Sequence, residues 1–116
     1  MRTNLPLIAA TLIALSCVSY VPPVLAGGSV ERGKAVIEQW CRTCHQQAGD
    51  TPNPDMAPPY EQIVLRPDHT RAYFMQFLKE DHFPMTTYRL FDSEREDVVA
   101  YLMALQQSEL NKRGGN

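Results

Sequence analysis

The stretch Cys41-Arg42-Thr43-Cys44-His45 decides how this chain of 116 residues folds. Two cysteines three positions apart, followed at once by a histidine, form a C-x-x-C-H motif, which is typical of a c-type haem attachment site. The two thiols can bond to the two vinyl groups of one porphyrin, and the adjacent histidine is then placed to reach the iron. The motif predicts one covalent haem c, attached through Cys41 and Cys44, with His45 as the proximal iron ligand.

Two other uses of a C-x-x-C pair fit this sequence less well. A thioredoxin-like redox pair has no use for the following histidine and belongs to a βαβ context, which is missing here. A structural zinc site needs four nitrogen or sulfur ligands, and the sequence offers neither a second C-x-x-C nor a paired histidine to complete one. Haem attachment is the interpretation that uses all three residues of the motif.

The N-terminus has the features of an export signal, which fits a protein whose haem is attached outside the cytoplasm. Arg2 supplies a positive start, residues 5–21 are largely apolar, and small residues precede the predicted cleavage site. We expect residues 1–26 to be a signal peptide, Gly27 to be the mature N-terminus, and the protein to be periplasmic. Two alternatives stay open: a retained membrane anchor, for which the apolar stretch is short, and a lipid attached to Cys17.

Residues 27–116 form one small domain of 90 residues with a formal charge of −3, because Arg2 is the only charge lost with the signal. A domain of this size is marginal on its protein core alone, so we expect the haem to be part of the fold. The mild negative charge argues against nucleic acid or an anionic membrane surface as a partner. It fits contact with other proteins, and we expect a monomer without a membrane span in the mature form.

The first half of this domain predicts one long helix and a long loop. Ser29 is a suitable N-cap for a helix over residues 30–40. Residues 46–59 are rich in proline and glycine, with asparagine and aspartate between them, and are expected to form a loop. Residues 60–65 can form a short helical turn before a proline stops it.

The second half predicts two further helices and no strand. Asp68 is the expected cap of a helix that extends to about residue 79. A proline-containing loop follows. Ser93 and Glu96 then form a capping box in front of the last helix, over residues 97–105.

With these elements in place, the chain resembles the class I cytochrome c family, the small all-helical monohaem electron carriers. Gly33 stands eight residues before Cys41, at the family's spacing, and residues 97–102 look like the family's C-terminal helix. The resemblance covers nearly the whole domain over residues 27–116 and implies an all-α cytochrome c fold, with three main helices plus loops around one covalently attached haem. It also implies that Gly33 lets two helix backbones approach closely.

The resemblance also assigns the partner of His45 and the distal iron ligand. In this family a proline carbonyl about a dozen residues downstream accepts a hydrogen bond from the proximal histidine, so Pro58 or Pro59 is the candidate. The sixth ligand comes from the loop before the last helix, where Met85 is the methionine available, and His/Met ligation raises the reduction potential. His82 in the same loop leaves a bis-histidine site open as an alternative.

Other polar and aromatic residues receive weaker interpretations. Buried haem carboxylates require hydrogen-bond donors, and the candidates are Tyr60, Arg66, Tyr88 and Arg89. We interpret His69 as a solvated residue at the start of a helix and Trp40 as a core residue. An acidic cluster is interpreted as helix N-terminal charge; it comprises Asp92, Glu94, Glu96 and Asp97.

The sequence therefore predicts an electron-transfer protein and not an enzyme: a periplasmic one-electron carrier that exchanges electrons with a protein donor and a protein acceptor. A small haem subunit of a dehydrogenase or oxidase complex is a variant of the same interpretation. The alternative of a different class is a ligand-binding or peroxidatic haem protein with a weak sixth ligand, in which Met85 is off the iron.

Overall fold

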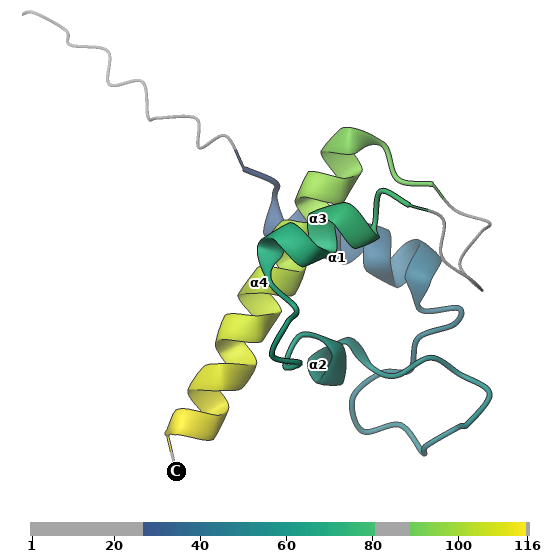
Figure 1. Cartoon of the computed structure of the whole chain (residues 1–116). Helices are drawn as coiled ribbons and strands as arrows, with labels where there is room; N and C mark the ends of the chain where they lie inside the picture. The colour runs from purple at the N-terminus through teal and green to yellow at the C-terminus, as the bar shows by residue number, and fades with distance from the viewer. Residues whose placement is uncertain (1–26, 81–88, 116) are drawn as a thin grey trace, which may run out of the picture.

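The computed structural model of the chain describes residues 27–80 and 89–115. The regular elements in these ranges are helical: α1 (Val30–Val36), the π-helical turn η1 (Ile37–Cys41), α2 (Tyr60–Ile63), α3 (Arg71–Phe77) and α4 (Asp92–Gly114). In Figure 1, α4 is the longest element, α1 and α3 lie near its N-terminal half, and its C-terminal end extends beyond the other helices. The all-α fold predicted from the sequence is confirmed.

The first helix starts where the sequence predicts, but its last turn is wider than an α-helical turn. The Ser29 hydroxyl accepts a hydrogen bond from the backbone N–H of Arg32, at 3.3 Å. After Val36 the helix continues as η1, and the Arg42 N–H donates to the carbonyl of Ile37 at 3.1 Å. Such π-helical turns are rare and frequently occur at functional sites. Here the turn directly precedes the C-x-x-C-H motif.

The crossing of α1 and α4 depends on Gly33. This glycine is buried, and a Cβ atom built on it collides with the backbone carbonyl of Asp97 and the nitrogen of Val98. Only a residue without a side chain permits this approach of the two helices. The close contact that the resemblance implies at Gly33 is therefore confirmed.

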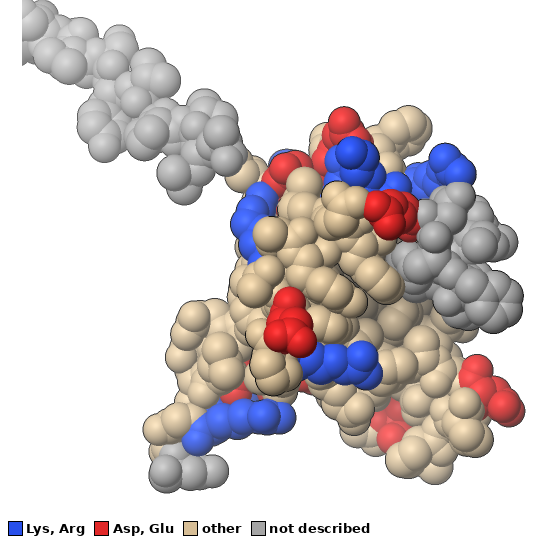
Figure 2. Space-filling view, in the orientation of Figure 1, with Lys and Arg blue, Asp and Glu red and all other residues tan. Residues whose placement is uncertain are grey.

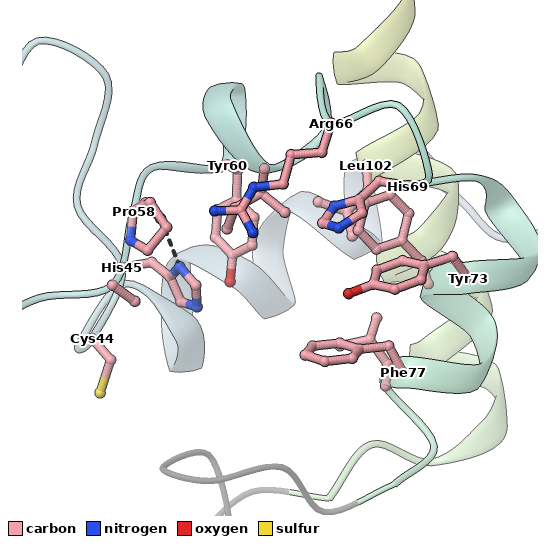
Figure 3. Close-up of a pocket in the computed structure, with 13 residues that line it drawn as sticks. Cys44, His45, Pro58, Tyr60, Arg66, His69, Tyr73, Phe77 and Leu102 are labelled. Carbon is pink, nitrogen blue, oxygen red and sulfur yellow. Dashed lines mark hydrogen bonds between the residues drawn. The ribbon is translucent and has the colours of Figure 1, made fainter.

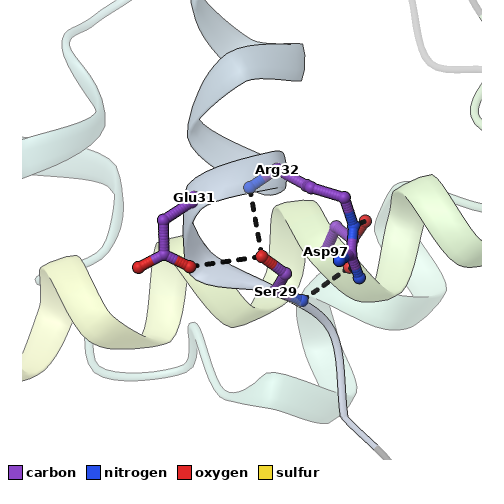
Figure 4. Close-up of polar contacts among 4 residues, drawn as sticks. All are labelled: Ser29, Glu31, Arg32 and Asp97. Atoms are coloured by element: carbon purple, nitrogen blue, oxygen red, sulfur yellow. Dashed lines mark hydrogen bonds and ion pairs between the residues drawn. The ribbon is translucent and has the colours of Figure 1, made fainter.

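An ion pair between the exposed Arg32 side chain and the buried Asp97 carboxylate holds the start of α1 against α4 (Figure 4). The Asp97 carboxylate, 6% exposed as a residue, accepts hydrogen bonds from the Ser29 N–H at 2.6 Å and from Nε of Arg32 at 2.7 Å. Hydrogen bonding to Arg32 is the main cause that lowers the pKa of Asp97 below its ordinary value. The interpretation of Asp97 as helix N-terminal charge is therefore wrong. Because α4 begins five residues earlier, Asp97 lies in its second turn and faces α1.

The start of α3 differs from the prediction by two residues. The Thr70 hydroxyl, not the Asp68 carboxylate, accepts the hydrogen bond from the backbone N–H of Tyr73, at 3.2 Å. Asp68 lies in the preceding turn, where its carbonyl accepts from the Thr70 N–H at 2.9 Å. Because Asp68 is part of this turn, it cannot serve as the cap. Thr70 is the first residue after the turn with an extended backbone and a side-chain oxygen, and it is therefore the N-cap.

The start of α4 also differs from the prediction. Phe91 is the N-cap residue, and its N–H donates to the Glu94 carboxylate at 2.9 Å. Ser93 lies within the first turn, and Glu96 forms an ion pair with Arg71 of α3. The predicted capping box of Ser93 and Glu96 is therefore wrong, because the box forms two residues earlier, with Glu94 accepting from the backbone N–H of Phe91.

The apolar core of the described residues is small and is built from η1, α2, α3 and α4, with Val36 of α1 packed against it. Its buried side chains are Ile37, Tyr60, Val64, Phe74, Val98, Val99 and Leu102. Trp40 is 48% exposed, so its interpretation as a core residue is wrong. Ile37, at the start of the same η1 turn, is buried. Within the described ranges, no helix combines the length and apolar character that a membrane crossing needs.

Candidate functional site

The C-x-x-C-H motif folds as a tight turn at the end of η1. The carbonyl of Cys41 accepts hydrogen bonds from the N–H groups of Cys44 and His45, at 3.2 and 3.0 Å. The Thr43 hydroxyl donates to the carbonyl of Trp40 at 2.7 Å. Cys41 is half-buried and Cys44 is exposed. Burial raises the pKa of the Cys41 thiol, which is therefore protonated at neutral pH.

His45 is buried and its ring is held by a proline carbonyl. Its Nδ1 atom lies 2.8 Å from the carbonyl oxygen of Pro58, and the residue is 8% exposed. Because a carbonyl only accepts, Nδ1 must carry the proton, and the tautomer therefore has its lone pair on Nε2, as a metal-binding imidazole requires. Of the two candidates named above, Pro58 and not Pro59 is the partner of His45.

A short backbone bridge sets this distance between His45 and Pro58. The N–H of Ala57 donates to the carbonyl of Cys44 at 2.8 Å, and the N–H of Gln46 donates to the carbonyl of Ala57 at 3.1 Å. These two bonds fold the loop between them back onto the motif. They place the residue after Ala57 beside the imidazole.

His45 and Cys44 lie at one side of a cavity of about 270 Å³. Figure 3 shows His45 and His69 on opposite sides of this space, with Tyr73 and Phe77 on the side of His69. Most of the wall is carbon, supplied by Ile63, Phe74, Phe77, Leu78 and Leu102. An apolar cavity with a few polar groups is the usual form of a cofactor site.

Tyr60 packs directly on the ring of His45. The two ring centroids are 4.5 Å apart and the ring planes are inclined by 25°. The Arg42 guanidinium lies 5.3 Å from the centroid of the Tyr60 ring. Burial is the main cause that raises the pKa of Tyr60, and the neighbouring Cys41 adds to it, so the hydroxyl stays protonated. The stack restricts how far the imidazole can rotate.

The donor set and the cavity fit a haem. A porphyrin needs a large apolar space, thiols for its vinyl groups and a histidine nitrogen of the right tautomer for its iron. Cys44 and His45 line the cavity, and Cys41 supplies the second thiol in the same turn. The residues that the sequence predicts for attachment and proximal ligation are thus close together beside one cavity.

Other predicted residues fall into three groups. Two candidates for the haem carboxylates, Tyr60 and Arg66, line the cavity. Arg89 is exposed and is not among the lining residues. Four residues lie outside the described part of the chain: Cys17, His82, Met85 and Tyr88.

His69 is the residue at this site that sequence reasoning missed. It is 9% exposed and lines the cavity, so its interpretation as a solvated residue is wrong. Its ring stacks on Tyr73, with centroids 4.1 Å apart. The shift of the helix cap from Asp68 to Thr70 explains the error. His69 belongs to the turn before α3, not to the exposed first turn of the helix.

Comparisons with known proteins agree with this site. Residues 28–102 match the family model described as cytochrome C oxidase, cbb3-type, subunit III. A curated relative, cytochrome c-552 of Bradyrhizobium diazoefficiens, is 28% identical over 75 residues, which cover 64% of this chain and 72% of the relative. No solved structure matches the chain.

The family match carries functional meaning because it includes both the C-x-x-C-H motif and the α1–α4 crossing. Members of this family are c-type cytochromes, which implies a haem c with its iron, a role in electron transfer, and redox proteins as partners. Since the match extends over more than half of the sequence, the chain belongs to the cytochrome c family that this model describes.

Proposed function

We propose that this protein is an exported one-electron carrier with one covalently attached haem c. Cys41 and Cys44 hold the porphyrin, His45 is the proximal ligand and Met85 the distal ligand. When bound, the haem iron supplies reversible one-electron oxidation and reduction. An iron with two protein ligands leaves no open position for a substrate, so the partners are a redox protein donor and a redox protein acceptor.

The hydrogen bond from His45 to Pro58 is the observation that carries this proposal. A carbonyl partner on Nδ1 fixes the tautomer and makes the other ring nitrogen a better metal ligand. Neither a thioredoxin-like pair nor a structural cysteine turn needs such a histidine. The apolar cavity beside His45 adds the space that a porphyrin requires.

Met85 is proposed on the family resemblance alone, because it lies outside the described residues. A thioether is a soft, neutral ligand that favours ferrous iron. His82 is the competing distal ligand, as a bis-histidine site.

The surface fits transient contact with other proteins. On the face drawn in Figure 2, basic and acidic side chains alternate over a largely uncharged surface. The formal net charge of the full sequence is −2. A mixed surface of this kind suits brief encounters better than binding to a polyanion.

Haem staining of the secreted protein on a denaturing gel tests attachment. We expect one covalent haem for each chain, lost in Cys41→Ala combined with Cys44→Ala and kept in the control Cys17→Ala. A haem that extracts from the unmutated protein into acidified organic solvent contradicts the proposal. The intact mass of the same sample tests export, with Gly27 expected as the N-terminus and a diacylglycerol on Cys17 as the contrary result.

Met85→Ala tests the distal ligand. We expect the haem to stay attached, the reduction potential to fall, and added ligands to gain access to the iron, because the thioether that favours the ferrous state is removed. Met75→Ala, a half-buried methionine of α3, is the control and should leave the potential unchanged. An unchanged spectrum in Met85→Ala together with a changed one in His82→Ala makes the iron bis-histidine.

The description of the matching family model favours one variant, a small haem subunit of an oxidase complex. Gentle purification of the protein at native abundance distinguishes this variant from a free carrier. A subunit co-elutes with a larger complex in fixed proportion, whereas a free carrier elutes at the size of the monomer.

A further inference from the structure

The buried imidazole of His69 has a nitrogen without a hydrogen-bond partner. The residue is 9% exposed, and its Nδ1 atom has no hydrogen-bond partner among residues 27–80 and 89–115. Leaving a buried polar atom unpaired costs about 1–3 kcal/mol, so native proteins rarely tolerate it without a ligand or a functional reason. Because His69 lines the cavity of the proposed haem site, the missing partner is expected there.

The turn that carries His69 is held rigidly. The His69 N–H donates to the carbonyl of Arg66 at 3.1 Å. The side-chain amide of Gln106 in α4 donates to the carbonyls of Val64 and His69, at 2.6 and 3.0 Å. The His69 ring also stacks on Tyr73 at 4.1 Å between centroids. The imidazole therefore cannot easily swing out to meet water.

Arg66 brings a positive charge to the same cavity. Its side chain is among those that line the cavity, and Figure 3 shows it extending between Tyr60 and His69. Among the described residues, Arg66 forms no ion pair with a carboxylate. An arginine fork and a ring N–H on one apolar wall match a planar anion with two oxygens, which is a carboxylate.

We propose that Arg66 and His69 form a carboxylate-binding subsite in the haem cavity, and that its occupant is a propionate of the haem itself. The inference rests on the proposed function. A porphyrin in this cavity brings two carboxylates, and a carboxylate held against an apolar wall must have donors. His69 donates from Nδ1 and Arg66 from its guanidinium, so the unpaired nitrogen and the unpaired cation acquire the same partner.

The subsite affects the reduction potential. A carboxylate close to the iron stabilises the ferric state, because its negative charge offsets the additional positive charge of the oxidised metal. Donors that hold and neutralise the carboxylate weaken this effect and raise the potential, in the same way that second-shell hydrogen bonds tune other metal centres. Removal of either donor lowers the potential.

The experiment uses the haem-loaded secreted protein. His69→Phe keeps an aromatic ring against Tyr73 but has no nitrogen, and His69→Gln restores a donor without the ring. We expect the potential to fall in His69→Phe and to recover at least in part in His69→Gln, with haem content equal in both. Arg66→Gln should lower the potential, and Arg66→Lys should lower it less. The double variant His69→Phe/Arg66→Gln should change less than the two single changes together, because both residues act on one group.

Arg71→Gln is the matched control. Arg71 is the first residue of α3, pairs with Glu96 and is not among the residues that line the haem cavity. If Arg71→Gln lowers the potential as much as Arg66→Gln, the effect is one of overall charge and the subsite is overturned.

Three other results have distinct meanings. Equal reduction potentials in the wild type, His69→Phe and Arg66→Gln overturn the subsite. If all three proteins then carry covalent haem, the proposed function is unaffected. Absence of covalent haem from the wild type refutes the proposed function itself. A wild-type potential that responds to added inorganic phosphate, with the response lost in Arg66→Gln, shows a site for anions from solution and also overturns the assignment to the propionate.

Discussion

At the residue scale, the stack of Tyr60 on His45 holds the imidazole in place from one face. The two rings lie 4.5 Å apart, and Tyr60 is 7% exposed. An aromatic pair of this geometry contributes about 0.5–1.5 kcal/mol beyond the area that it buries. The ring of Tyr60 thus both fills the core and limits the motion of the imidazole.

We therefore expect Tyr60→Ala to lower the free energy of unfolding by about 3–5 kcal/mol, because it removes a buried ring and leaves a cavity. Tyr60→Phe keeps the ring and loses only the hydroxyl, which hydrogen-bonds to the Cys41 sulfur, so it should cost less than about 1.5 kcal/mol, the upper end of the usual net value of one hydrogen bond. Urea denaturation of the haem-loaded protein measures both. Phe91→Ala, at a residue that is 76% exposed, is the control, and an equal loss there would refute the role of Tyr60.

The sequence could predict some of these residues and not others, for reasons of local geometry. The C-x-x-C-H spacing is a property of adjacent residues, so sequence alone identifies Cys41, Cys44 and His45. The sequence does not show which of Pro58 and Pro59 accepts the hydrogen bond from His45, because the answer depends on the bridge between His45 and Ala57. The burial of His69 follows from contacts with Tyr73 and Gln106, which no local pattern encodes.

At the scale of elements, the contact between α1 and α4 sets the architecture. Gly33 permits the backbones to approach, and Asp97 then fixes the register through Ser29 and Arg32. The glycine spacing was recognisable from the family resemblance. The role of Asp97 was not, because a carboxylate near a helix start usually serves the helix end.

Gly33→Val should destabilise the haem-loaded protein by more than about 3 kcal/mol, since the added side chain meets the backbone of Asp97 and cannot be accommodated by a rotamer change. Thermal unfolding followed by circular dichroism measures this. Gly27→Ala is the control, because a Cβ at Gly27 has no atom within 4 Å. Equal stability of the wild type and Gly33→Val would show that the two helices do not cross as described.

The Asp97 ion pair predicts a dependence of stability on pH. Hydrogen bonding to Arg32 holds the pKa of Asp97 below the value of about 3.9 in an unfolded chain. The contribution to stability is therefore complete above that value and is lost as pH falls through the lower pKa of the folded state.

Asp97→Asn should accordingly have a lower urea midpoint than the wild type at pH 7, with the difference shrinking as the pH is lowered toward 3. Asp55→Asn, at an exposed aspartate, is the control. A difference between wild type and Asp97→Asn that stays the same from pH 7 to pH 3 would contradict the assignment of this ion pair.

At the scale of the whole molecule, helix positions follow from the sequence better than helix ends. Apolar spacing and breakers located the first and last helices, since these signals extend over many residues. The caps at Thr70 and Phe91 depend on which of several nearby acceptors reaches a free N–H in the folded chain. The η1 turn has no sequence signal of its own, and it leaves Trp40 exposed while Ile37 is buried.

The whole domain has a core too small to be stable without help. Among the described residues, seven hydrophobic side chains are buried, and two of them, Phe74 and Leu102, also line the cavity, as does the more exposed Phe77. Small domains usually need a cofactor, a metal or disulfides to compensate for the conformational entropy lost on folding. Phe77, which lines the cavity and is 38% exposed, is expected to become more buried when a haem covers it.

We therefore expect the chain without covalent haem, made as Cys41→Ala/Cys44→Ala, to lack a cooperative unfolding transition, although it keeps part of its helix content. Far-ultraviolet circular dichroism and near-ultraviolet signals during heating measure this, with Cys17→Ala as the haem-loaded control. A sharp transition at the same midpoint in both proteins would show that the seven buried residues suffice and that the haem is not part of the fold. A broad transition that sharpens when haem is added without covalent attachment would separate the effect of the porphyrin from that of its tethers, because mass action alone then stabilises the folded chain.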